Sequence, residues 1–249
     1  MKVAAIIQAR MGSSRLPGKV LMNLCGRPVL WHIVNRIQES RYIDSVIIAT
    51  SKNREDDVVE RFAVENYINI YRGSQMNVLE RFYKCARQYR PDIIVRLTGD
   101  NALIDPRIAD LGIEYFFSKK DLDYVYYREG LPLGMAFEIF SSQALAKTYA
   151  EAEDAECLEH VTPYMYLNQD KFRSERVHVI GEDNSNLRWT LDTRRDYELL
   201  KRIYESLYSK DKPFFCYEDI LEEYRSHEEW KMVNSDVKQV ELRYRGDNK

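Results

Sequence analysis

Strand and helix patterns alternate regularly through the first half of the chain. Continuous apolar runs predict buried strands at 3–8, 46–49, 68–71 and 93–97. Apolar residues at helical spacing predict helices at 30–37, 55–63 (capped by Asn53), 78–89 and, after a proline, 106–117. This order predicts an α/β fold with a doubly wound, mostly parallel sheet. Ligands of such sheets bind beyond the carboxyl ends of the strands.

The second half of the chain has a less regular pattern. Strands are predicted at 123–128, 135–140 and 188–191, and helices at 142–153, 157–167, 194–208 and 218–224. We find no repeat, low-complexity linker or domain boundary, and 249 residues are enough for one α/β domain with a sizeable core. We therefore predict a single domain over residues 1–227, followed by an extended, charged tail over 228–249.

The first predicted strand runs straight into a basic, glycine-containing loop. Its three cations and four small residues are Arg10, Arg15, Lys19, Gly12, Ser13, Ser14 and Gly18. Forked arginine donors, a compact lysine charge and accessible backbone N–H groups are typical of a loop that binds polyphosphate. The P-loop is excluded, because five residues rather than four separate Gly12 from Gly18 and valine follows Lys19. A basic surface loop without a ligand is the alternative.

Two carboxylates follow predicted strands. Asp100 comes just after the strand at 93–97, and Asp192 comes directly after the strand at 188–191. Both could face the crevice beside the basic loop, and a hard cation such as Mg²⁺ prefers carboxylate and phosphate oxygens. Basic loop and carboxylates together predict Mg²⁺-assisted nucleotidyl transfer. Alternatively, Asp192 caps the following helix and Asp100 forms a turn with Asn101.

The composition narrows the classes of partner. A net charge of -3 argues against bulk nucleic-acid binding. No apolar run reaches the roughly 18 residues of a membrane span, and the first run is too short for a signal peptide. The four cysteines are scattered without a C-x-x-C pair, which is typical of inert thiols in a reducing compartment. These features predict a cytoplasmic protein.

Residues 8–21, QARMGSSRLPGKVL, resemble the opening motif of the sugar cytidylyltransferases. That family includes the CMP-Kdo and CMP-N-acylneuraminate synthetases, and the resemblance is strongest to its SpsF-like branch of spore-coat polysaccharide biosynthesis. Further similar segments follow in collinear order at 72–74, 78–81, 96–106, 159–164 and 187–193, so the resemblance covers roughly residues 1–210. The family often has proline where Ala102 stands, and Glu138 is the only acidic residue of the segment 134–138.

The resemblance implies a role for each matching residue. It implies the three-layer α-β-α, Rossmann-like fold of the nucleotide-diphospho-sugar transferases, and commonly a homodimer that uses the irregular segment 123–140. In the implied site, the CTP phosphates contact Arg10, Ser13, Arg15 and Lys19, and Mg²⁺ is bound by Asp100 and Asp192. The cytosine would lie near Arg72, Ser74 and Thr98. The acceptor sugar would contact Glu138 and His160. Without the resemblance, a lone histidine such as His160 is more often structural.

We therefore expect transfer of CMP from CTP to an acidic sugar of nonulosonic or 2-keto-3-deoxy type, with release of pyrophosphate, for surface polysaccharide or glycan synthesis. Lys19 and Arg15 would stabilise the leaving side. Transfer to a phosphorylated sugar or alcohol, giving a CDP-linked product, is the main alternative. A glycosyltransferase of the same fold would usually carry an Asp-x-Asp motif, and the only one here, at 121–123, precedes a predicted strand. A non-catalytic CTP-binding protein is the remaining alternative.

Overall fold

The computed structural model describes residues 1–127, 130–177, 181–209 and 211–239. Over these ranges a seven-stranded sheet has the order β5-β4-β1-β6-β8-β7-β9. Its strands are β1 (Val3–Gln8), β4 (Ser45–Ser51), β5 (Asn69–Gly73), β6 (Ile93–Thr98), β7 (Tyr124–Tyr127), β8 (Glu138–Ser141) and β9 (Ser174–Val177). β8 runs antiparallel to β6 and β7, whereas the other neighbouring strands in this part of the chain pair in parallel. The predicted mostly parallel, mixed sheet is confirmed.

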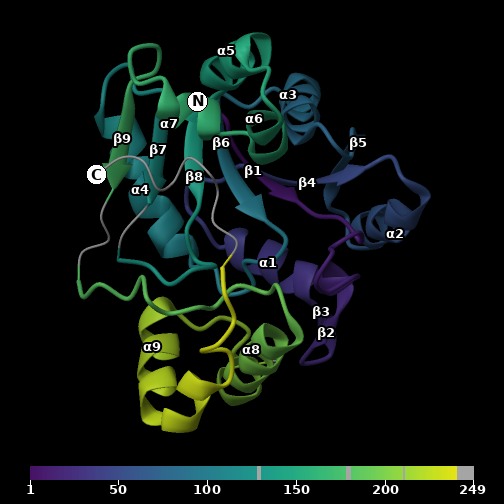
Figure 1. Cartoon of the computed structure of the whole chain (residues 1–249), viewed down its shortest axis with the longest axis vertical. Helices are drawn as coiled ribbons and strands as arrows, with labels where there is room; N and C mark the ends of the chain where they lie inside the picture. Colours follow the sequence, from purple (N-terminus) through teal and green to yellow (C-terminus); the bar gives the residue numbers. More distant parts are fainter. Residues whose placement is uncertain (128–129, 178–180, 210, 240–249) are drawn as a thin grey trace.

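Helices cover both faces of this sheet (Figure 1). The α-helices are α1 (Val29–Ile37), α2 (Asp57–Glu65), α3 (Val78–Tyr89), α4 (Pro106–Ser118), α5 (Ser142–Glu151), α6 (Ala155–His160), α7 (Pro163–Leu167), α8 (Arg194–Leu207) and α9 (Tyr217–Ser226). The shorter elements are the 3-10 helices η1 (Lys19–Leu21), η2 (Arg54–Asp56) and η3 (Glu228–Met232), and a small hairpin of β2 (Asn23–Leu24) and β3 (Arg27–Pro28).

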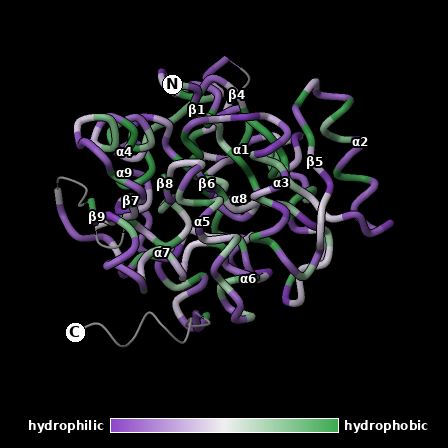
Figure 2. The backbone as a smooth tube through the Cα atoms, turned by 90° about the horizontal axis from the view of Figure 1, so that it is seen from above, coloured by the Kyte–Doolittle hydropathy of each residue, from purple (hydrophilic) through white to green (hydrophobic). Residues whose placement is uncertain are grey.

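Side chains along β1 point alternately to the two faces of the sheet, so that the sheet packs between two layers of helices. Val3, Ala5 and Ile7 belong to one core cluster, which includes apolar residues of α1, α4, α8 and α9. Ala4 and Ile6 point to the opposite face and join a second cluster with α3, α5 and α6. Figure 2 shows that hydrophobic stretches of the backbone lie in the inner elements and hydrophilic ones in the outer loops. No helix among the described residues is long and apolar enough to span a bilayer.

Several predictions for the second half are wrong. The strand expected at 188–191 is only an isolated bridge between Arg188 and Leu133, and the strand β9 was not predicted. The segment at 188–191 instead crosses Gly134, where an added Cβ would lie 2.5 Å from the backbone nitrogen of Thr190. The helix expected at 157–167 is broken at Val161, which has a positive φ of 72° two residues before Pro163.

Two further local predictions differ from the structure. Asn53 precedes η2 rather than an α-helix, and its side chain makes no capping hydrogen bond. The expected extended tail begins instead with η3, and Trp230 is buried in the same core cluster as α8 and α9. The charged residues around Trp230 hide this buried position in a sequence pattern. The division of the chain at residue 227 stays a prediction.

Candidate functional site

The basic loop and both predicted carboxylates meet at the carboxyl ends of β1 and β6. Lys19 Nζ lies 2.8 Å from Asp100 Oδ2 and 2.9 Å from Asp192 Oδ1. Arg15 Nη2 lies 3.0 Å from Asp192 Oδ2. The side chains of Lys19 and Asp192 are 12% and 13% exposed, so these charges interact in a partly desolvated place. Three segments that are far apart in the sequence thus bring four predicted site residues together.

Backbone hydrogen bonds hold the basic loop in its shape. The N–H groups of Ser13 and Gly18 both donate to the carbonyl of Met11, at 2.9 Å each. Met11 N in turn donates to Oδ1 of the buried Asp56 at 2.7 Å, which ties the loop to η2. Gly18 adopts a φ of 73°, a left-handed conformation that glycine accepts at little cost, and Lys19 then begins η1. The conformation of the loop therefore directs Lys19 toward the carboxylates.

The two alternatives for the carboxylates have different outcomes. Asp100 does lie in a turn, in which Asn101 N donates to the carbonyl of Thr98 at 3.2 Å. Thr193, not Asp192, is the N-cap of α8, and it forms a capping box with Asp196. The capping alternative for Asp192 is therefore wrong. The hydroxyl of Thr98 donates to Asp100 Oδ1, and Leu191 N donates to the carbonyl of Asp100 at 3.0 Å. This backbone bond joins the two carboxylate-bearing segments directly.

The two carboxylates of the cluster are paired with a lysine and carry the ligand atoms that suit a hard cation. Burial lowers the pKa of Lys19, but Asp100 and Asp192 raise it more, so the pKa lies above its usual value and the ammonium stays charged. One ammonium contacts both carboxylates, which offer the oxygen ligands that a divalent cation prefers. In the described ranges no group of three or more acidic, histidine or cysteine side chains gathers as a metal site. Phosphate oxygens and water would have to complete the coordination.

A small cavity lined by two arginines lies beside this cluster. Its volume is about 90 Å³, and Gln8, Ala9, Arg10, Val78, Arg81, Glu159 and His160 line it. Arg81 is 2% exposed; its Nη1 donates to the carbonyl of Ser74 at 2.7 Å, whereas its Nε is buried without a hydrogen-bond partner. Burial lowers the pKa of Arg81 to about 10, and the nearby charge of Arg10 contributes to the shift. The structure therefore brings Arg10 and His160 to the same cavity.

Glu138 belongs to a polar layer next to that cavity. It pairs across the antiparallel strands with Arg96 of β6, and Arg96 also donates to Gln8 Oε1 at 3.0 Å. Oε1 of Glu138 accepts hydrogen bonds from the hydroxyls of Tyr124 and Thr162. Thr162 N donates to the carbonyl of His160 at 2.9 Å. Glu138 and His160 are thus linked through one threonine, and the Glu138 carboxylate is engaged on both oxygens.

Arg72 and Ser74 lie at the end of β5 in a different set of contacts. Arg72 pairs with Asp57 at 2.7 Å and Glu60 at 2.6 Å on α2. It also donates to two backbone carbonyls at the end of β4, each at 2.9 Å. Ser74 Oγ accepts from Asn77 N at 3.0 Å, just before α3. These contacts brace the edge of the sheet, and the assignment of both residues to the cytosine stays a prediction.

Three arginines of the site were not predicted. They are Arg81, Arg96 and Arg188, the last of which contacts Asp192 Oδ2 at 3.2 Å. A signal for Arg81 is present, since it lies among the apolar positions 78, 79, 82, 85 and 86 of one helix face. Arg96 similarly interrupts an apolar strand. A charged residue at a buried position is costly unless it is paired, so such positions point to a function or a network.

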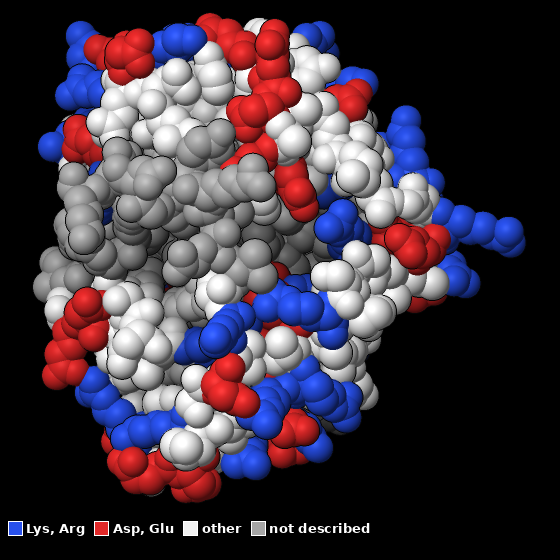
Figure 3. All heavy atoms as spheres, in the orientation of Figure 1, with Lys and Arg blue, Asp and Glu red and all other residues white. Residues whose placement is uncertain are grey.

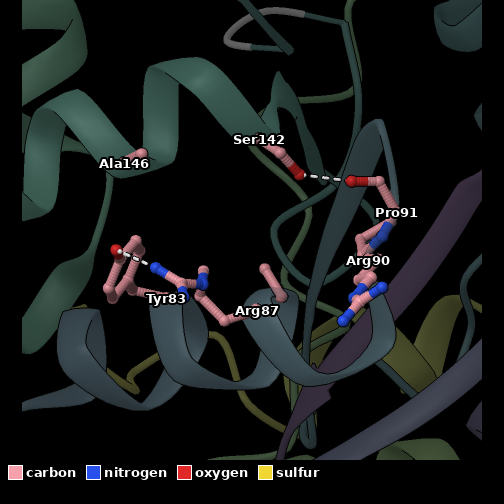
Figure 4. A pocket seen from close by; sticks show the side chains of 7 residues that line it. Tyr83, Arg87, Arg90, Pro91, Ser142 and Ala146 are labelled. Atoms are coloured by element: carbon pink, nitrogen blue, oxygen red, sulfur yellow. Dashed lines mark hydrogen bonds between the residues drawn. The ribbon is translucent and has the colours of Figure 1, made fainter.

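A larger cavity of about 450 Å³ lies between α3 and α5 (Figure 4). Arg90 and Pro91 precede β6, and Ser142 follows the antiparallel β8. This cavity therefore lies at the amino end of β6, whereas Asp100 lies beyond its carboxyl end. Figure 4 shows Arg87 turned to the Tyr83 hydroxyl, at 3.1 Å, and Arg90 on the other side of the space. The two arginines do not converge, and we do not assign the reaction to this cavity. Basic and acidic side chains are interspersed over the face in Figure 3.

Comparisons with known proteins bear on the family of the chain. A family model described as Cytidylyltransferase matches residues 4–241. The spore coat polysaccharide biosynthesis protein SpsF of Bacillus subtilis is 35% identical over 206 residues, which are 80% of this chain and 85% of that protein. A 3-deoxy-manno-octulosonate cytidylyltransferase of Trichlorobacter lovleyi is 34% identical over 122 residues, 49% of this chain and 48% of that protein.

A solved structure is similar to this chain in its fold over nearly the whole length. The structure of a cytidylyltransferase from Leptospira borgpetersenii serovar Hardjo-bovis has a TM-score of 0.86 and 31% identity, and the match covers 97% of this chain and 100% of that one. The expected three-layer, Rossmann-like nucleotidyltransferase fold is confirmed. With a family model that matches nearly its whole length, the chain is a nucleotidyltransferase and belongs to the cytidylyltransferase family.

Proposed function

We propose that this cytidylyltransferase moves CMP from CTP to an acidic sugar, a nonulosonic or 2-keto-3-deoxy acid, and releases pyrophosphate. The observation that carries the proposal is the contact of Lys19 with Asp100 and Asp192, at 2.8 and 2.9 Å, at the end of a basic loop. This arrangement combines cations for phosphates with carboxylates for a metal ion. The name of the B. subtilis relative supports a product used in surface polysaccharide or glycan synthesis, and that of the T. lovleyi relative supports an acidic deoxy sugar as the acceptor.

The basic loop would bind the triphosphate. Arg15 offers a forked donor and is exposed enough to turn toward a ligand, while Lys19 offers a compact charge. The backbone N–H of Ser14 and the hydroxyls of Ser13 and Ser14 would add neutral donors, since the N–H of Ser13 is bonded to Met11. Because the pKa of Lys19 is raised, its ammonium is present across the physiological pH range. Positioned cations stabilise the negative charge that develops when pyrophosphate leaves.

Asp100 and Asp192 would hold a divalent cation, for which Mg²⁺ is the natural candidate with a nucleotide. When bound, Mg²⁺ would supply positive charge that stabilises the phosphates during transfer and would lower the pKa of a nearby hydroxyl. The chain supplies the two carboxylates, and Thr98 and Arg188 orient them through hydrogen bonds. We assign no general base.

The two arginines of the small cavity support an anionic acceptor. Arg10 and Arg81 line it together with Glu159, and the nearby charge of Arg10 lowers the pKa of Arg81. A carboxylate in the acceptor would offset the repulsion between the arginines. His160 would contact the same group or a neighbouring hydroxyl, and Glu138 would hold the wall of the cavity through Arg96. A phosphate group has the same charge preference, so a phosphorylated acceptor is the second candidate.

Pyrophosphate release tests the proposal. We expect release with Mg²⁺ and CTP when an acidic sugar is added, and little with ATP, GTP or UTP. Release with a phosphorylated sugar or alcohol instead would move the assignment to a CDP-linked product. Release that depends on a different base would overturn the choice of CTP. No release with any acceptor, together with no shift of the melting temperature by CTP, would contradict the assignment of the basic loop.

Arg81 is expected to select for the acceptor. Arg81→Gln should raise the KM for the acidic acceptor by about 10- to 100-fold, since a hydrogen bond to a charged group contributes about 1.5–3 kcal/mol. The KM for CTP should change much less. Arg87→Gln is a matched control, because Arg87 lies on the same helix but lines the cavity at the amino end of β6. Steady-state kinetics with each substrate varied would measure both constants, and an unchanged acceptor KM would contradict the assignment.

A further inference from the structure

We propose that the segment after α9, residues 230–239, positions the Asp192 carboxylate through a buried relay of Asn234, Asp196 and Arg188. The inference rests on the proposed function, because it takes Asp192 as a ligand of the divalent cation. The three residues of the relay would act as positioning residues and would not touch the reacting atoms. The sequence pattern of residues 230–239 indicates only a charged tail. Through the relay, this segment would affect catalysis.

Arg188 joins two aspartates. Its Nη2 lies 3.2 Å from Asp192 Oδ2 and 3.0 Å from Asp196 Oδ2, and its Nε lies 2.8 Å from Asp196 Oδ1. The side chain is largely buried, and Asp196 is fully buried. Because the guanidinium is planar, two bonds to Asp196 fix its plane. The nitrogen that meets Asp192 is therefore placed by Asp196.

Asp196 also holds the backbone on which Asp192 stands. Its Oδ2 accepts hydrogen bonds from Asp192 N at 3.1 Å and from Thr193 N at 2.8 Å. Burial raises the pKa of Asp196, but hydrogen bonds from Arg188 and Asn234 lower it more, and the carboxylate stays ionised. Asp196 thus fixes both the main chain of Asp192 and, through Arg188, one oxygen of its side chain.

Asn234 connects this network to the end of the chain. It is 4% exposed, and its amide nitrogen donates to Asp196 Oδ1 and to the carbonyl of Arg188, both at 2.9 Å. Trp230 anchors the segment in the core, and Arg188 Nη1 donates to Gln239 Oε1 at 2.6 Å. Both bonds of the Asn234 amide therefore end on residues that place Asp192. A segment that only covered the surface would need neither bond.

The relay determines which oxygen of Asp192 faces the cation site. Arg15 and Arg188 both contact Oδ2, whereas Oδ1 faces Lys19. Oδ1 is therefore the oxygen directed toward Asp100, and the loss of the relay would let the carboxylate rotate. Groups that orient metal ligands from outside the coordination sphere typically affect metal affinity by about 10- to 100-fold. A change of this size in metal affinity is the expected signature of the relay.

Mn²⁺ binding measures this effect without turnover. The binding would be followed by electron paramagnetic resonance on the full chain with a CTP analogue whose α,β-bridging oxygen is a methylene group. Asn234→Ala is expected to weaken Mn²⁺ binding by about 10- to 100-fold. Arg188→Lys, which keeps the charge but loses the planar fork, should weaken it comparably and serves if Asn234→Ala does not fold. Arg195→Ala removes the exposed pair of the same segment with Asp236 and should bind Mn²⁺ like the wild type.

Asp192→Asn separates the two proposals. If Asp192→Asn leaves Mn²⁺ binding unchanged, Asp192 is not a ligand and the metal assignment of the proposed function is wrong. If Asp192→Asn weakens binding while Asn234→Ala and Arg188→Lys both bind like the wild type, only the relay is overturned. Equal weakening in Arg195→Ala would also contradict the relay, because any loosening of the C-terminal segment would then have the same effect.

Discussion

Asp192→Asn should lower the rate of pyrophosphate release by about 10²- to 10³-fold, the loss typical of one removed electrostatic contact to the transition state. The amide keeps the size of the side chain but removes the negative charge that faces Lys19 and Arg15. The start of α8 should remain intact, because Thr193 and Asp196 form its cap. Asp100→Asn should have an effect of similar size. Single-turnover release of pyrophosphate at saturating CTP would measure the loss.

The control for this prediction is Asp170→Asn, at an exposed position that the site does not use. It should leave both turnover and the melting temperature unchanged. The two site variants should melt within a few degrees of the wild type, which would separate a catalytic loss from unfolding. Turnover like that of the wild type in both Asp100→Asn and Asp192→Asn would contradict the assignment of the carboxylates.

The first half of the fold could be predicted because its strands are buried on both faces. Continuous apolar runs such as 3–8 and 93–97 have few readings other than parallel strands, and the parallel order places their carboxyl ends together. That rule was enough to bring the basic loop near Asp100. The contact with Asp192 was inferred from a strand that does not exist, yet the residue lies where it was expected. The connecting bond is the one from Leu191 N to the carbonyl of Asp100.

The rest of the site depends on contacts between segments far apart in the chain. The hydrophobic pattern of a short segment does not predict such contacts. Arg188 bridges to Leu133, and the next two residues pass Gly134, because glycine there leaves room for a second backbone; a strand pattern does not show this approach. Asn234 is a single amide in a charged segment, and its burial follows from the packing of Trp230. Arg81 did carry a signal in its helix spacing. Long-range placement of polar groups is thus the part of the site that sequence reasoning missed.

Lys19→Met should abolish most activity and also destabilise the ligand-free protein. Removal of one partner of a buried ion pair can cost about 3–5 kcal/mol, and Arg15 and Arg188 should reduce this cost because they still neutralise Asp192. We therefore expect a loss of about 1–3 kcal/mol in the free energy of unfolding. Pyrophosphate release should fall by about 10²-fold or more. Urea denaturation and single-turnover kinetics would measure the two effects.

The stability difference between Lys19→Met and the wild type should depend on pH with a defined sign. The pKa of Lys19 is raised in the folded state, so its contribution is fully present below the unfolded value of about 10.5 and is lost as the pH rises through the folded value. The difference should therefore be constant over the neutral range and should fall as the pH rises above about 10.5. Lys201→Met, which removes an exposed pair with Glu205, should cost at most about 1 kcal/mol. A difference that stays flat well above this pH would show that the ammonium does not stabilise the carboxylates in the way that the distances indicate.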